Sequence, residues 1–310
     1  MDDIFTTTIL VATIASGIRL ATPFLLASLG ETLGQRSGVL NLGVDGVMLL
    51  GAFTAYYAVL KTGSLLLGIL LGTCLGGVMG LLYAFITVNL QAQQGVSGIG
   101  IYLFGLGLSD LLFQKLVGTP QPIMPFPPLF IPVLSDIPVI GEMFFQHSLI
   151  VYLAFLLVPL LTLLINRTTF GMNVRSIGEN PEAADSLGVS IAKVRYTTII
   201  LGNGLAGLAG AALAIELGIF QQNLTNSMGF IAVALVYFGA WRPVGTMAGS
   251  LVFGIVAAIV LLCKTLGIIP RSASDLAAMA PAIITILALA VAVNRFRPPT
   301  ALTKPYNREG

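Results

Sequence analysis

Apolar segments of about 20 residues follow one another along almost the whole chain. A helix of that length spans a bilayer, and a helix satisfies its own backbone hydrogen bonds where water is absent. The composition agrees, since 56% of the residues are hydrophobic and only 9% are charged. We therefore predict an all-α polytopic membrane protein in which residues 1–293 form one transmembrane domain and residues 294–310 a tail. About nine spans are expected, near residues 8–28, 39–60, 65–88, 96–117, 149–165, 196–217, 228–240, 244–262 and 276–293.

Basic residues are divided unevenly between the two sets of loops that nine spans would create. One side carries Arg36, Arg167, Arg175, Lys193, Arg195, Arg242, Arg295, Arg297, Lys304 and Arg308, and the other carries only Lys61, Lys115, Lys264 and Arg271. The basic side of a membrane protein faces the cytoplasm. We therefore expect the N-terminus outside, and the tail and the segment 166–195 in the cytoplasm.

The stretch from Phe170 to Tyr196 is the longest polar interval, and it contains the signals of a short helix. Asn180 can cap a helix, Pro181 suits its first position, and Gly188 can close it in a left-handed conformation. Two turns of helix are not stable alone in water, so this helix must dock on its own membrane domain or on a partner. We predict a cytoplasmic coupling helix formed by Asn180, Pro181, Glu182, Ala183, Ala184, Asp185, Leu187 and Gly188.

The order of the spans predicts an inverted repeat. Four spans are followed by a fifth that crosses back, by the polar segment and by four more spans, so that the two groups of four run antiparallel. The second span of each group is irregular, because Gly43, Asp45 and Gly46 interrupt one and the other covers only 228–240. Such segments at matching positions indicate a substrate pathway. Ordinary glycine packing and a merely short helix are the alternative.

Charges inside apolar segments are costly and usually face a partner or a water-filled cavity. Arg19 and Asp45 lie at similar expected depths on consecutive spans, so they form a structural pair or line the pathway. Four further charges lie at span boundaries, where contact with water is expected; these are Glu31, Arg36, Asp110 and Glu216.

No motif indicates an enzyme or a bound cofactor. The sequence GNGLAG at 202–207 has the spacing of a dinucleotide site, but it lies inside an apolar span, where Gly207 and Gly210 favour close helix packing instead. A phosphate-binding GxxxxGK[ST] loop is absent, so an ATP-driven role requires a separate ATPase subunit. His147, the only histidine, has no second ligand for zinc and is expected at the surface.

Three passages resemble one known family. They are RSGVLNLGVDGVM at 36–48, GMNVRSIGENPEAADSLG at 171–188 and FIAVALVYFGAWRPVGTMAGSLVFG at 230–254. The chain resembles, from Thr8 to Val293, the permease subunits of bacterial ABC importers for branched-chain amino acids, ribose and nucleosides, and it is most similar to the nucleoside-type branch. The resemblance implies a multi-pass protein of the bacterial inner membrane. Its implied partners are a second permease, identical or a paralogue, two cytoplasmic ATPase subunits that bind ATP, and an external binding protein. We expect lipid contacts and no nucleic-acid partner.

The resemblance also implies a nucleoside cargo, carried by alternating access, and makes the stretch from Asn41 to Asp45 part of the pathway. Aromatic rings can stack on a base, and an amide can hydrogen-bond to a base or a sugar. The predicted pathway residues are Asn41, Gly43, Asp45, Tyr102, Phe104, Tyr237 and Phe238. The alternatives are an ABC permease for a simple sugar or a branched-chain amino acid, and an ion-coupled secondary transporter.

Overall fold

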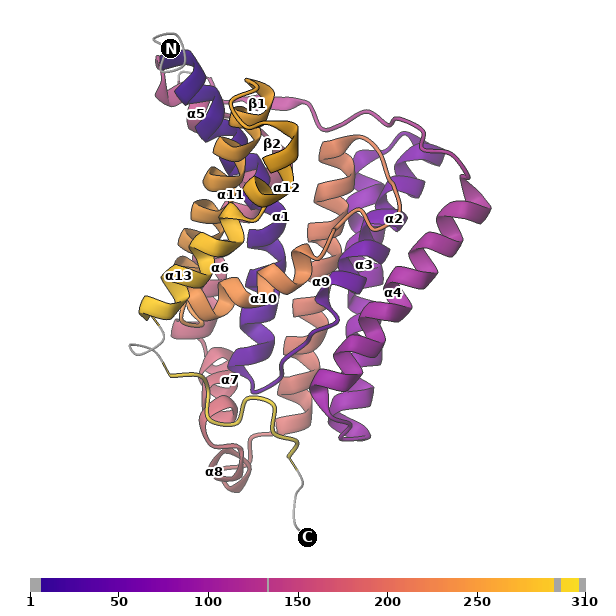
Figure 1. Ribbon diagram of the computed structural model, residues 1–310. Helices are drawn as coiled ribbons and strands as arrows, with labels where there is room; N and C mark the ends of the chain where they lie inside the picture. Colours follow the sequence, from indigo (N-terminus) through magenta and orange to yellow (C-terminus); the bar gives the residue numbers. More distant parts are fainter. Residues whose placement is uncertain (1–6, 133, 293–296, 307–310) are drawn as a thin grey trace.

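The structure is a computed structural model that describes residues 7–132, 134–292 and 297–306. It is a bundle of helices with one small pair of strands (Figure 1). The long helices are α1 (Thr7–Arg36), α2 (Val44–Thr62), α3 (Leu65–Ala84, extended by the π-helical turn Phe85–Asn89), α4 (Gln94–Leu116), α6 (Leu149–Arg167), α9 (Ile191–Leu217) and α11 (Pro243–Thr265). The shorter elements are β1 (Pro128–Phe130), α5 (Ile140–Phe144), β2 (Gln146–Ser148), α7 (Thr169–Glu179), α8 (Pro181–Ser186), α10 (Met228–Phe238), the 3-10 turn Arg271–Ala273, α12 (Ser274–Ala278) and α13 (Ala280–Ala292).

Seven helices are long and apolar enough to cross a membrane, and they are the seven long helices named above. The all-helical, multi-pass class is therefore confirmed. The predicted spans 228–240 and 276–293 correspond to shorter helices, since α10 has 11 residues and α13 has 13. The count of nine spans stays a prediction. Residues 1–6, 293–296 and 307–310 lie outside the described residues, so the predictions for the extreme N-terminus and for much of the tail are not tested.

Helix α9 lies at the centre of the bundle, packed against α1, α2 and α3. Small residues permit this packing. A Cβ atom on Gly207 would meet the backbones of Gly72 and Gly76, and one on Gly210 would meet the backbone of Met48. The prediction that Gly207 and Gly210 serve close helix packing is confirmed.

Helices α2 and α10 both begin inside the bundle. The connection from α1 to α2 rises from the α8 end, and the connection from α9 to α10 descends from the α5 end, so both helices start near mid-height (Figure 1). A Cβ atom on Gly229 would meet the backbone of Asp45, which shows that the two helix starts touch. The inverted repeat of four plus four helices stays a prediction.

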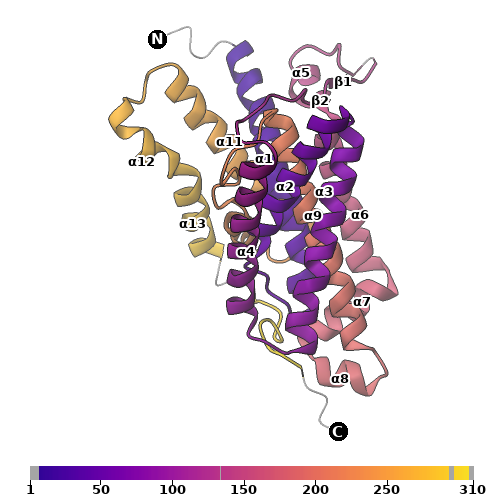
Figure 2. The same ribbon diagram turned by 90° about the vertical axis from the view of Figure 1, so that its right-hand side faces the viewer.

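The tail runs across the α8 end of the bundle (Figure 2). The Ala301 amide donates to the Gly178 carbonyl at 2.9 Å, and the Thr303 amide donates to the Gly38 carbonyl at 3.2 Å. Ala301 is only 2% exposed. The tail therefore joins the end of α7 to the connection between α1 and α2.

Candidate functional site

The starts of α2 and α10 are joined through the carboxyl group of Asp45. Its Oδ1 accepts a hydrogen bond from the Gly229 amide at 2.7 Å, and its Oδ2 accepts one from the Thr225 hydroxyl at 3.0 Å. The side chain of Asp45 is 0% exposed. Ser227, the residue before α10, makes no side-chain cap of its own. Asp45 thus supplies the N-terminal cap of a helix that lies 184 residues further along the chain.

Asp45 also lies in the first turn of α2. The N-terminal end of a helix is positively polarised, so one carboxylate stabilises both helix starts. In transporters, the start of a broken helix is a common binding position for a negatively charged substrate group. Here the protein's own carboxyl group fills that position.

The predicted pair of Arg19 with Asp45 is not formed in the described structure. Arg19 donates to the hydroxyl of Ser16 at 3.1 Å and lines a small hollow with Glu216. The depth estimate was wrong because α1 continues to Arg36 instead of ending near Ser28. Arg19 therefore lies 17 residues from the end of α1, which is roughly 25 Å of helix.

One face of α10 is the best candidate for contact with a cargo. Phe230, Ile231, Ala234, Tyr237 and Phe238 are all partly exposed, and the other residues between 229 and 236 are buried. The partly exposed positions recur at helical spacing and therefore form one stripe. We call these five residues the α10 stripe.

The structure brings some of the predicted pathway residues to this stripe. The ring of Tyr102 lies edge-on to Phe230 with centroids 5.1 Å apart. Tyr237 and Phe238 belong to the stripe itself. Phe104 lies two residues beyond Tyr102, about 200° around α4, and is 49% exposed on another side of that helix.

Asn41 and Gly43 are buried, and they do not belong to the stripe. The Asn41 amide nitrogen Nδ2 donates to Asn203 Oδ1 at 2.8 Å, and Asn41 Oδ1 accepts from the Gly43 amide at 2.8 Å. These contacts fix the connection that leads into α2. In this structure Asn41 therefore holds the backbone of that connection and contacts Asn203 of α9.

Glu31 is the main functional candidate that the sequence reasoning missed. The sequence places it at a solvated boundary, but in the structure it is only 5% exposed. Its Oε1 accepts hydrogen bonds from the backbone N–H of Asn41 at 2.9 Å and from Gln35 Nε2 at 3.1 Å. Gln35 Oε1 in turn accepts from Trp241 Nε1 at 2.7 Å. This buried network links α1, the start of α2 and the turn after α10. The sequence indicates this network only through three polar residues, Glu31, Thr32 and Gln35, which lie close together in an otherwise apolar helix.

His147 lies at the opposite end of the bundle, and its expected surface position was wrong. It is 2% exposed, and Nε2 lies 2.8 Å from the Met143 carbonyl, so Nε2 donates the proton. Burial lowers the pKa of His147, the hydrogen bond to Met143 opposes this, and the positive charge of Arg19 lowers the pKa further. His147 is therefore neutral and holds the loop that precedes α6.

The polar segment forms α7 and α8 at the other end of the molecule, as Figure 1 shows. Asn180 Oδ1 accepts from the Ala183 amide at 3.0 Å, Pro181 is the first residue of α8, and Gly188 has φ of 82°. The predicted helix and its capping residues are thus present, although α8 ends at Ser186 and not at Leu187. Ala184 is buried among Val174, Ile177, Ile191 and Val194. Leu187 is 84% exposed and offers an apolar contact to another molecule.

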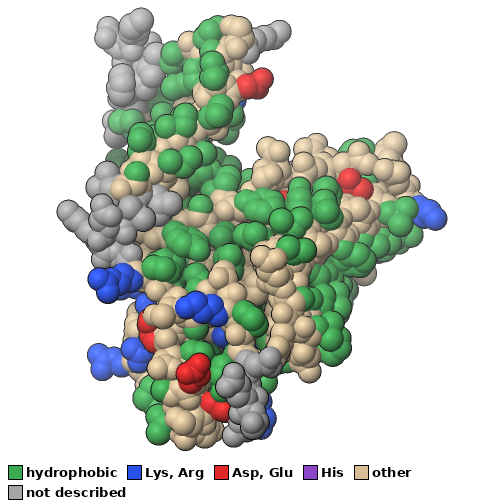
Figure 3. All heavy atoms as spheres, turned by 60° about the horizontal axis from the view of Figure 1, so that its bottom comes forward, with side chains coloured by type: hydrophobic (Ala, Val, Ile, Leu, Met, Phe, Trp, Pro, Cys, Tyr) green, Lys and Arg blue, Asp and Glu red, His purple; other side chains and the backbone are tan. Residues whose placement is uncertain are grey.

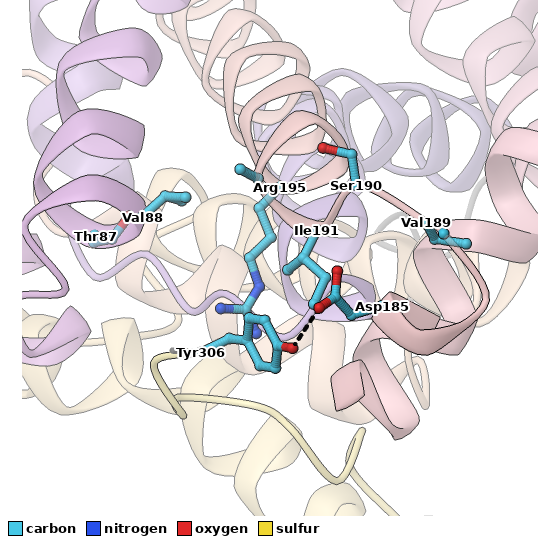
Figure 4. Close-up of a pocket in the computed structure, with 10 residues that line it drawn as sticks. Thr87, Val88, Asp185, Val189, Ser190, Ile191, Arg195 and Tyr306 are labelled. Atoms are coloured by element: carbon cyan, nitrogen blue, oxygen red, sulfur yellow. Dashed lines mark hydrogen bonds between the residues drawn. The ribbon is translucent and has the colours of Figure 1, made fainter. Parts of the chain in front are cut away.

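A cavity of about 520 Å³ lies between α8, the start of α9 and the tail. Figure 4 shows the side chains of Tyr306, Asp185 and Arg195 grouped in it, with the Tyr306 hydroxyl donating to Asp185 Oδ2 at 3.0 Å. Arg195 is buried at 2% exposure and donates to the carbonyls of Ser37 and Lys304. The tail therefore contacts α8, α9 and the connection that leads to Asn41.

In comparisons with known proteins, the chain is similar to permease components of transport systems. Residues 13–292 match the family described as branched-chain amino acid transport system / permease component. A protein of Haloferax volcanii that is provisionally assigned as a glucose ABC transporter permease is 34% identical over 94% of this chain and 96% of its own length. A guanosine ABC transporter permease protein of Bacillus subtilis is 33% identical over 92% of this chain and 93% of its own length. A nucleoside ABC transporter permease protein of Lactococcus lactis is 34% identical over 93% of this chain and 94% of its own length.

A second guanosine ABC transporter permease protein of Bacillus subtilis matches at 24% identity over 76% of this chain. No solved structure matches the chain.

Proposed function

The chain belongs to the family of branched-chain amino acid transport system permease components, and we propose on that basis that it is the membrane permease of an ATP-driven importer of nucleosides. The observation that carries the proposal is the similarity to the guanosine and nucleoside permeases, which extends over more than nine tenths of each chain. The transport subunit performs no chemistry in this proposal. ATP is hydrolysed by separate subunits, and the cargo moves by alternating access.

The surroundings of Asp45 favour a neutral cargo. An amino acid would require a cationic group or a free helix N-terminus for its carboxylate. The two helix starts in the middle of the bundle are already neutralised by Asp45, which accepts from Thr225 and Gly229. A second negative charge there would meet repulsion from this carboxylate, so branched-chain amino acids fit this site poorly.

The α10 stripe favours a cargo with a planar ring. Phe230 and Tyr237 lie seven residues apart, two turns along one face, and Tyr102 stands edge-on beside Phe230. Aromatic faces stack on a nucleobase by about 1–3 kcal/mol per base. A simple sugar lacks a planar ring and needs several polar partners. The glucose permease relative nevertheless makes a sugar importer the second candidate.

Helix α8 is proposed as the contact for the ATPase subunits. It is docked through buried Ala184, it carries exposed Glu182 and Ala183, and exposed Leu187 directly follows it. A short helix held by its own membrane domain transmits a push to the helices on both sides of it. On this proposal the α8 end is cytoplasmic, as the distribution of basic residues predicts, and the α5 end faces outward, where a binding protein delivers the cargo.

The second permease is proposed to be a paralogue. Two guanosine permeases of Bacillus subtilis are similar to this chain at different levels, 33% and 24%, which supports a pair of unlike permeases. Expression of a tagged copy beside an untagged copy tests this point. Recovery of the untagged copy with the tagged one would favour a pair of identical permeases instead.

Uptake measurements test the cargo. Cells that carry the complete transporter are given labelled guanosine, adenosine, glucose, ribose or leucine, and cells with an ATPase subunit inactivated in its ATP-binding loop serve as the control. We expect ATP-dependent uptake of nucleosides that excess free base reduces and excess ribose does not. Uptake of glucose or leucine without nucleoside uptake would overturn the assignment, and uptake that persists in the control would indicate a secondary transporter.

A further inference from the structure

Four arginines from distant parts of the sequence lie close together at the α8 end of the bundle. Arg36 ends α1, Arg175 lies in α7, Arg242 directly precedes α11, and Arg297 lies in the tail. Three of them, Arg36, Arg175 and Arg242, line a hollow of about 380 Å³. An adjacent hollow of about 190 Å³ is lined by Arg36, Arg242 and Arg297. Figure 3, which looks towards this end, shows Lys and Arg side chains gathered on one side of that surface. We call these four residues the arginine pocket.

Among the described residues that line the two hollows, positive charge exceeds negative charge. Glu179, which lines the smaller hollow, is the one acidic side chain among the residues that line either hollow. It attracts Arg36, whereas Arg175 and Arg242 repel Arg36. Four cations against one carboxylate leave a net charge of about +3, with Arg36 and Arg175 partly buried and Arg242 and Arg297 exposed. Such an arrangement favours an external anion.

Two of the guanidinium groups are held in position by backbone carbonyls. Arg36 Nε donates to the Trp241 carbonyl at 2.8 Å, and Arg175 Nε donates to the Gly171 carbonyl at 3.4 Å. The terminal nitrogens of both remain available for a ligand, as far as the described residues go. Donors of this kind, fixed in advance and fork-shaped, suit a phosphate group.

The flank of the larger hollow indicates where the phosphate comes from. Thr162 and Asn166, near the end of α6, line it together with the first residues of α11. Exposed apolar side chains adjoin them: Leu163, next to Thr162 on α6, is 56% exposed, and Val244, which lines the hollow, is 52% exposed. Both helices are long and apolar enough to cross a membrane, so in a bilayer these side chains would be in a position to contact acyl chains.

We propose that the arginine pocket binds the headgroup phosphate of an anionic phospholipid, whose acyl chains lie against the exposed side chains of α6 and α11. Basic pockets between membrane helices are suited to such headgroups. A free phosphate or nucleotide would satisfy the arginines equally but would gain nothing from the apolar flank. The site does not depend on which cargo the protein carries.

Native mass spectrometry of the purified full-length protein tests the proposal. Phosphatidylglycerol and phosphatidylcholine with the same acyl chains are added to the protein in detergent, and the retained lipids are counted. We expect selective retention of phosphatidylglycerol. Replacing Arg242 and Arg297 together by Gln should weaken it at least tenfold, because both charge-assisted contacts to the phosphate are lost. Both side chains are exposed, so this variant should fold.

Control variants distinguish a specific lipid site from a general effect of surface charge. Arg167→Gln removes an exposed arginine at the end of α6 that lines neither hollow, and it should leave retention unchanged. Replacing Arg242 and Arg297 by Lys keeps the charge and should retain part of the binding. Equal weakening in Arg167→Gln would show a general surface charge and overturn the proposal. Displacement of the lipid by millimolar inorganic phosphate would assign the pocket to a soluble anion, and displacement by added ATPase subunits would assign it to an acidic protein partner; either result would overturn the lipid assignment.

Discussion

Asp45 has separate partners for its two carboxyl oxygens, and both partners lie in the segment that starts α10. In Asp45→Ala, the Gly229 amide and the Thr225 hydroxyl lose their acceptor in the interior, at about 1–3 kcal/mol for each buried group. We expect a clear fall in the melting temperature of the purified protein and loss of transport. Asp45→Asn keeps one acceptor oxygen and the shape of the side chain, so it should be intermediate.

The matched control for Asp45 is a second carboxylate inside a membrane helix. Asp110 lies in α4, is partly buried, and its Oδ1 has no hydrogen-bond partner among the described residues. Asp110→Asn removes a charge without breaking such a contact, and its melting temperature should stay close to that of the unchanged protein. If Asp45→Ala and Asp110→Asn melted alike, the capping role of Asp45 would be refuted.

The sequence identified Asp45 as unusual but not what it contacts. A charge in an apolar segment is visible in the sequence because it breaks the local pattern. Its partner Gly229 is a glycine among many, and its contact is a backbone amide that the sequence does not distinguish. Glu31 was misplaced for a related reason, since the end of α1 was predicted eight residues too early and moved Glu31 out of the helix.

Helix α8 shows what local chemistry can predict. Its start, its cap and its closing glycine all involve residues within eight positions of one another, and all three were read correctly from the sequence. Its docking surface was not predicted, because Ala184 packs against residues of α7 and α9. The lengths of α10 and α13 likewise depend on packing, and an apolar run alone does not fix whether a segment spans a bilayer.

Weakening the start of α8 tests its proposed role in coupling ATP hydrolysis to transport. Replacing Asn180 and Pro181 together by Gly removes the cap and the fixed backbone of the first turn, at about 1 kcal/mol in total. Because the spans are untouched, we expect normal amounts of protein in the membrane but reduced transport for each ATP hydrolysed by the purified transporter. Asn180→Asp keeps the capping oxygen and should behave like the unchanged protein. Unaltered coupling in the double glycine variant would contradict the proposed role.

The tail connects parts of the whole molecule that no single helix joins. It binds Gly38 before α2, Gly178 at the end of α7 and Asp185 in α8. Removing the chain from Arg297 onward should leave the spans folded but free α8 to move. We expect weaker retention of ATPase subunits on an affinity column, with little change in the melting temperature. Tyr306→Phe removes one hydroxyl contact to Asp185 and should give a smaller effect in the same direction. Full retention after truncation would show that α8 is held by Ala184 and its neighbours alone.

The order of synthesis determines when these tail contacts can form. A chain is made from its N-terminus, and residues 299–306 follow every helix of the bundle. The ribosome must therefore have made α13 before Ala301 can reach Gly178 or Tyr306 can reach Asp185. The surface around α8 is completed only after the membrane helices have been made, so a half-made chain would present an unfinished surface to the ATPase subunits proposed to bind there.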